Sequence, residues 1–245
     1  MKRHNHINGR IPLIVSFVCV FFFTSAVKAQ ISIQLKQNNT ELRYDQPVRL
    51  YQVLDDAYKQ FPFIPYTLGT TLFNPNKQQQ VDTQKQGILQ DLAKLNSTAS
   101  QQLAKQLNAM SFAFREKIET DPIKVQIFPN LNPMIKSDYI LSMPNRPDHI
   151  LIIDPHTNNP IKLSLKANSN LKDYLSQLSH SQHKNTAWII QANGDVYQAT
   201  DIQWRDSLYF LSPGAIVFIG LDNLPDAVNN LNARIAFLLA FYTDI

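Results

Sequence analysis

Residues 149–178, HILIIDPHTNNPIKLSLKANSNLKDYLSQL, decide the fold of this chain because they contain three elements in a recognisable order. The apolar run at 149–154 indicates a strand, PHTNN indicates a turn, and residues 160–165 indicate a returning strand. Residues 168–178 then predict a helix, because their apolar residues recur at the spacing of one helical face. Those residues are Leu171, Tyr174, Leu175 and Leu178.

Three further strands are expected after this helix, at 186–191, 196–200 and 215–221. The sequence ANGD lies between the first two, and its Asn-Gly pair is typical of a tight hairpin turn. The resulting order of two strands, one helix and three strands resembles a β-grasp, in which a mixed sheet folds over one helix. We therefore expect a β-grasp domain at 145–222.

The chain before residue 145 opens with the same order of elements. Alternating residues predict strands at 31–36 and 40–45. A helix is expected next, with Asp45 as its N-cap and Pro47 in its first turn. Residues 30–144 are therefore interpreted as a first β-grasp domain, and the chain as an α+β protein with two tandem β-grasp (ubiquitin-like) domains.

An inserted helical hairpin at about 81–114 is predicted within the first domain. Two apolar stripes are separated by NSTAS at 96–100, which contains a break and a cap. A single long helix is the alternative. Strands are expected to resume at 123–128 and at 138–143.

Residues 1–29 predict a cleaved secretory signal peptide. The basic start MKRHNHINGR precedes an uncharged run at 11–27, and small residues stand before a cut at Gln30. An uncleaved anchor helix is the alternative, since this run approaches the roughly 20 residues that a membrane span needs. Cleavage would give an exported, periplasmic protein.

The positive charge of the chain comes mostly from this leader. Lys and Arg number 23 against 19 Asp and Glu, and residues 1–29 contain four of the bases and none of the acids. The mature chain is therefore neutral, which argues against a nucleic-acid partner. The single cysteine, Cys19, also lies in the leader. Because the phosphate-binding glycine motifs are absent as well, no cofactor is expected.

The densest charge cluster is FREKIETDP at 114–122. Its acids Glu116, Glu119 and Asp121 could form the carboxylate pair of a polysaccharide-modifying enzyme. However, glycosidase carboxylates face each other across a bond, whereas these three acids lie close together at one turn. A solvated charged turn is therefore favoured, and no catalytic residue is predicted.

Arg115, in the same cluster, is the predicted ligand-binding residue. It follows an apolar stripe that ends at Phe114, so we expect its stem to be partly buried. A guanidinium in that position could bind a carboxylate or phosphate in bidentate fashion. It could equally pair with an acid of its own chain, such as Asp121.

Histidines and tryptophan offer weaker signals. On a strand, His149 and Asp154 point to opposite faces, and His180 and His183 lie in a polar loop, so no metal site is expected. The aromatic residues Trp204 and Tyr209 could stack on sugar rings, but such residues are more typical of packed anchors.

The C-terminal segment 223–245 predicts an amphipathic helix that begins after Asn223, with Pro225 in its first turn. Its second half is apolar nearly all round, because Phe237 and Phe241 lie opposite the main apolar stripe. Nine uncharged residues are too few for a membrane span. Phe237 and Phe241 are therefore predicted to meet a second domain, another subunit or an export partner.

The order of these motifs resembles the GfcC family of periplasmic capsule-biosynthesis proteins of Gram-negative bacteria and its YjbG-like relatives. The resemblance is carried by FREKIETDPIKVQ, by DYILSMPNRP and by YFLSPGAIVFIGLDNLPDAVNNLNARIAFLLA at 209–240. It extends through nearly the whole mature chain. A tryptophan-proline turn of the family is replaced here by FPFIPY at 61–66, which places any aromatic role at that turn in doubt.

The resemblance implies two β-grasp domains with a helical hairpin and a C-terminal amphipathic helix. It also implies a likeness to the periplasmic domains of outer-membrane polysaccharide export proteins, no established enzymatic activity, and an arginine in a cleft at the position of Arg115.

We therefore expect a non-enzymatic periplasmic accessory protein in capsule or exopolysaccharide biosynthesis or export. It would bind a surface polysaccharide or dock to an outer-membrane polysaccharide export protein, and it could form an oligomer through its C-terminal helix. The alternatives are a polysaccharide-modifying enzyme that uses the cluster of Glu116, Glu119 and Asp121, and an export-pore component that inserts its C-terminal helix.

Overall fold

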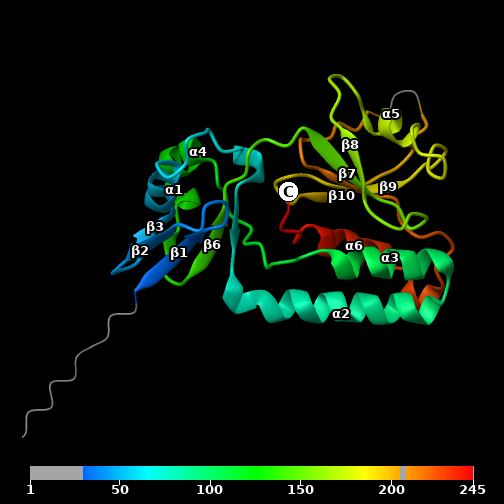
Figure 1. The fold of residues 1–245 in the computed structure, drawn as a ribbon, viewed down its shortest axis with the longest axis horizontal. Helices are drawn as coiled ribbons and strands as arrows, with labels where there is room; N and C mark the ends of the chain where they lie inside the picture. The colour runs from blue at the N-terminus through cyan, green and yellow to red at the C-terminus, as the bar shows by residue number, and fades with distance from the viewer. Residues whose placement is uncertain (1–29, 205–207, 245) are drawn as a thin grey trace, which may run out of the picture.

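A computed structural model describes residues 30–204 and 208–244 of the protein. The predicted signal peptide at 1–29 therefore lies outside the described residues. The fold is mixed α+β, as expected, with two larger sheets, a helical hairpin and a helix near the C-terminus (Figure 1).

The first sheet has four strands in the order β2-β1-β6-β4. Their bounds are Ile31–Leu35 for β1, Glu41–Tyr44 for β2, Thr71–Phe73 for β4 and Tyr139–Ser142 for β6. The central pair β1 and β6 is parallel, and the two outer pairings are antiparallel. Alternate residues of β1 are buried on one face of the sheet, where helices α1 (Leu50–Tyr58) and α4 (Pro122–Ile127) complete a core.

The second sheet has five strands in the order β10-β9-β11-β7-β8. The bounds are His149–Ile153 for β7, Ile161–Ser164 for β8, Ala187–Ile190 for β9, Val196–Ala199 for β10 and Ile216–Phe218 for β11. The central pair β7 and β11 is again parallel. Both faces of the sheet are apolar: Ile152 faces a core with α5 (Leu171–Leu175), and Ile153 faces a second core with helices from elsewhere in the chain.

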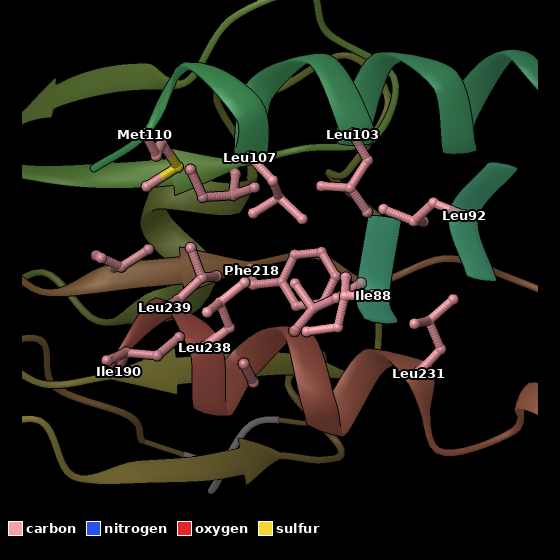
Figure 2. Packing of buried hydrophobic residues seen from close by; sticks show 14 of the residues in the cluster. Ile88, Leu92, Leu103, Leu107, Met110, Ile190, Phe218, Leu231, Leu238 and Leu239 are labelled. Atoms are coloured by element: carbon pink, nitrogen blue, oxygen red, sulfur yellow. The ribbon is translucent and has the colours of Figure 1, made fainter. Parts of the chain in front are cut away.

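The predicted helical hairpin packs against the second sheet, although it is inserted between two strands of the first. It consists of α2 (Gln78–Leu95) and α3 (Thr98–Ala109). Figure 2 shows Leu103 and Leu107 of α3 facing Phe218 of the second sheet, with Leu238 of the C-terminal helix beside them. The two parts of the chain therefore share one core.

The predicted break between these helices is confirmed at Asn96 and Ser97. Asn96 adopts a left-handed conformation, with φ of 46°, that ends α2. The Ser97 side chain accepts a hydrogen bond from the backbone N–H of Ser100, and the Ser100 side chain accepts one from the N–H of Ser97. This reciprocal capping starts α3 afresh and excludes a single long helix.

Three local predictions were wrong. Residues 123–128 were expected to form a strand, but they belong mostly to helix α4, which is capped by Asp121. Helix α1 starts later than expected, because β3 (Val48–Arg49) first pairs with β5 (Met134–Ile135); its N-cap residue is Arg49 rather than Asp45. The hairpin ends at Ala109 instead of continuing to residue 114.

The C-terminal helix α6 (Leu231–Leu239) follows a short 3-10 turn at Asp226–Val228, so Pro225 precedes the helix rather than lying in its first turn. Most of its apolar residues are buried between the hairpin and the second sheet (Figure 1). A salt bridge of 2.6 Å from Arg234 to Asp91 joins α6 to α2. Among the described residues, no helix has both the length and the apolar character needed to cross a membrane.

Candidate functional site

A cleft of about 1060 Å³ opens where four segments of the chain meet. Its lining comes from residues 67–71 and 114–124, from the turn at 193–196 between β9 and β10, and from Phe237, Ala240 and Phe241 at the end of α6. The structure therefore brings together Arg115 and the two C-terminal phenylalanines, which the sequence singled out for separate reasons.

Arg115 is fixed in the cleft by its backbone. Residues 114–116 run antiparallel to β4, where the N–H of Asn74 donates to the carbonyl of Phe114 (2.8 Å) and the N–H of Glu116 donates to the carbonyl of Leu72 (2.9 Å). This pairing adds a short extended segment beside β4, at the edge of the first sheet. Helix α3 does not continue to residue 114 because the backbone groups of residues 114–116 are hydrogen-bonded to β4 instead.

The Arg115 side chain extends to the second sheet and packs on the turn at Gly194. A Cβ atom added to Gly194 would lie only 3.1 Å from Nε and 3.2 Å from Cζ of Arg115. Gly194 has φ of +84°, a left-handed conformation that suits glycine. The Asn-Gly turn predicted from ANGD therefore forms one wall of the cleft as well as joining two strands.

The guanidinium of Arg115 forms no salt bridge and no hydrogen bond with any residue that the structure describes. Burial lowers the pKa of Arg115 to about 10, and the nearby Asp195 carboxylate offsets part of that effect. The group therefore still carries its positive charge at neutral pH. Pairing with Asp121, which the sequence left open, does not occur, because Asp121 instead accepts hydrogen bonds from the backbone of α4.

The two glutamates of the cluster are held by other residues. Glu116 accepts hydrogen bonds from Asn74 (2.6 Å) and Lys77 (2.7 Å), and Glu119 accepts one from Lys124 (3.1 Å) and others from the backbone. Burial on its own would raise the pKa of each glutamate, but these hydrogen bonds outweigh it and hold both pKa values below normal. A general acid needs a raised pKa, so this arrangement does not support the enzymatic alternative.

The two phenylalanines differ in their surroundings. The ring of Phe241 stacks on the ring of Phe114, with 5.4 Å between their centroids. The backbone carbonyl of Phe241 accepts a hydrogen bond from the N–H of Ala113. Phe237 is 52% exposed and makes up part of the apolar wall of the cleft. Its contact with a partner remains a prediction, whereas Phe241 already has a structural role.

The histidines and loop aromatics lie outside this cleft. His156 and His180 lie side by side, with ring centroids 5.8 Å apart, but residues 30–204 and 208–244 contain no group of three or more side chains suited to holding a metal. Tyr209 donates its hydroxyl hydrogen to the carbonyl of Thr200 and is a packed anchor. Trp204 is 71% exposed.

Fold and site together define an α+β protein with two mixed sheets that share a helical core. A cleft lies between the sheets, around an arginine that has no ion-pair partner among the described residues. The chain belongs to the capsule biosynthesis GfcC family: the model of the family's N-terminal part matches residues 27–146, and that of its C-terminal part matches residues 159–242. It is also 25% identical over 160 residues to the uncharacterized protein YjbG of Escherichia coli (strain K12), covering 60% of this chain and 65% of that protein.

Proposed function

We propose that this chain is a non-enzymatic periplasmic accessory protein in capsule or exopolysaccharide biosynthesis or export. The predicted signal peptide supports the location, and membership of the capsule biosynthesis GfcC family supports the process. The protein would act by binding a ligand in the cleft around Arg115, with the exposed ring of Phe237 available to a glycan or an export protein.

We further propose that each larger sheet, with its packed helix, forms a β-grasp unit. In both sheets the first and last strands of the unit are central and parallel, and the second strand is antiparallel to the first. When the strands of the second sheet are numbered along the chain from 1 to 5, their order in the sheet is 4-3-5-1-2. The four strands of the first sheet, numbered in the same way from 1 to 4, have the order 2-1-4-3. These orders support the tandem arrangement that the sequence suggested.

A single observation carries the functional proposal: the charged guanidinium of Arg115 is largely enclosed yet has no partner among the described residues. Burying a charge without a partner costs folding free energy. A fold that keeps such a group at the wall of a cleft is therefore consistent with a ligand that supplies the missing anion.

Substituting Arg115→Ala in the chromosomal gene tests this proposal. Surface polysaccharide is expected to fall towards the level of a deletion strain, while the melting temperature of the purified protein stays near that of the wild type. Arg43→Ala is a matched control, since Arg43 is exposed and pairs with Glu41 of the same strand β2, away from the cleft. Unchanged polysaccharide, or a loss of stability comparable to that of a core substitution, would refute a binding role.

A further inference from the structure

The charges around the cleft favour a ligand with a single negative charge. Four acids line the cleft: Glu116, Glu119, Asp121 and Asp195. Lys124 already pairs with Glu119, and Lys117 is exposed. Among the described residues that line the cleft, Arg115 is therefore the enclosed cation left to receive an anion. A dianion would be repelled by the surrounding carboxylates, whereas a planar carboxylate matches the guanidinium fork with one charge.

The hydrogen-bonding groups of the cleft favour a ligand that brings hydroxyl donors. The hydroxyl of Thr120 donates to the carbonyl of Thr70, so its oxygen can only accept from a ligand. The carboxylate of Glu119 also retains acceptor capacity. The cleft therefore presents acceptor oxygens beside Arg115.

The third feature is the apolar wall. The half-exposed ring of Phe237 stands beside the stacked pair of Phe114 and Phe241, and all three rings line the cleft. An aromatic surface of this kind suits the apolar C–H face of a sugar ring. The volume, about 1060 Å³, slightly exceeds the roughly 300–1,000 Å³ typical of small-molecule sites, so the cleft has room for more than one sugar unit.

We propose that the cleft binds an acidic saccharide, with the sugar carboxylate on Arg115, sugar hydroxyls on the acceptor oxygens of Thr120 and Glu119, and an apolar ring face on Phe237. This inference rests on the proposed function of the cleft as a ligand site, and it adds the chemical class of the ligand.

Binding of simple methyl glycosides tests this class directly. Protein purified after export is titrated with the methyl β-glycosides of glucuronic and galacturonic acid, with their neutral counterparts methyl β-glucoside and methyl β-galactoside, and with N-acetyl-alanyl-alanine as a peptide carboxylate. Binding is followed by NMR of the arginine Nε–H signals and of the ligands. At least one uronide is expected to bind roughly tenfold more tightly than its neutral counterpart, and more tightly than the dipeptide.

Variants separate the contributions of charge and ring. Arg115→Ala should abolish the preference for the uronide over the neutral sugar. Phe237→Ala should weaken the binding of the uronide and of its neutral counterpart by the same factor, roughly threefold or more. The reason is that the ring would contact the apolar sugar face and not the carboxylate. Phe210→Ala is the matched control: Phe210 is also an exposed phenylalanine, but it lies outside the cleft, so this variant should bind as the wild type does.

The outcomes distinguish this inference from the proposed function. If neither uronide binds more tightly than its neutral counterpart, or if the dipeptide binds more tightly than both, the acidic-saccharide class is overturned. The proposed function would still stand if Arg115→Ala reduced surface polysaccharide without loss of folding. If Arg115→Ala leaves surface polysaccharide unchanged, the proposed function fails, whatever the binding data show.

Discussion

At the scale of single residues, Gly194 lies directly against the Arg115 side chain. We predict that Gly194→Ala destabilises the protein by about 1–2 kcal/mol, because its φ of +84° is left-handed and strained for a residue with a Cβ atom. The new Cβ would also lie 3.1 Å from Arg115 Nε and displace the guanidinium. The melting temperature should fall by about 2–4 °C per kcal/mol, and ligand binding at Arg115 should weaken.

Gly87→Ala provides the matched control for this prediction. Gly87 lies inside α2, where a Cβ would make an ordinary contact of 3.4 Å with Arg234, and alanine favours the helix by roughly 0.5–1 kcal/mol. This variant should therefore raise the melting temperature and leave the cleft unaltered. A Gly194→Ala protein as stable as the wild type would show that Arg115 is not constrained by this turn.

Arg115 also shows how far residue-level prediction from sequence could reach. The charged cluster was visible in the sequence, and so was the Asn-Gly turn. The sequence could not show that this turn, about 80 positions later, lies against Arg115, because nothing local encodes that contact. It also could not show that Glu116 is held by Asn74 and Lys77, which come from an earlier loop.

At the scale of elements, helix α4 illustrates a competition between two local signals. The alternation of IKVQIF favoured a strand. Asp121 followed by Pro122 favoured a helix start, since aspartate caps and proline suits the first helical position. The second signal prevailed: Asp121 binds two backbone N–H groups, and only Val125 of the helix is buried, against the core of the first sheet.

The contact between α2 and α6 includes a salt bridge from Arg234 to the Asp91 carboxylate, which gives a prediction for pH. Hydrogen bonds from Lys94 and then Arg234 hold the pKa of Asp91 below its usual value of 3.8. A depressed folded-state pKa stabilises the protein above the unfolded-state value, and this stability is lost as pH falls through the folded-state pKa. Asp91→Asn should therefore lower the free energy of unfolding at pH 7 by about 0.2–1 kcal/mol.

The difference between wild type and Asp91→Asn should shrink when urea unfolding is repeated at pH 3. Asp55→Asn is the control, since Asp55 pairs with Lys59 on the exposed face of α1 and joins no two elements. Its effect at pH 7 should be smaller. A difference for Asp91→Asn that is equal at pH 7 and pH 3 would contradict a role for the ionised carboxylate.

At the scale of the whole molecule, the sequence predicted the order of elements better than their packing. Periodicity identified the hairpin helices and their apolar stripes, but it could not indicate which sheet those stripes would cover. A sheet with one apolar face needs one layer of helices packed against it. The second sheet is apolar on both faces and therefore needs a helical layer on each face. Ile153, Ile190 and Phe218 supply the face that the hairpin covers.

This shared core predicts that damage to the hairpin reaches the second sheet. Leu103 of α3 is fully buried with Ile190 and Phe218, so Leu103→Ala should cost about 2–5 kcal/mol. Native-state hydrogen exchange should become faster in β9 and β11, although α3 is inserted between strands of the first sheet.

Leu54→Ala in α1 is the matched control, because Leu54 is equally buried but lies in the core of the first sheet. It should accelerate exchange in β1 and β6 first. Faster exchange confined to β1 and β6 in the Leu103→Ala protein would mean that the hairpin belongs energetically to the first sheet, and that the shared core does not couple the two halves of the molecule.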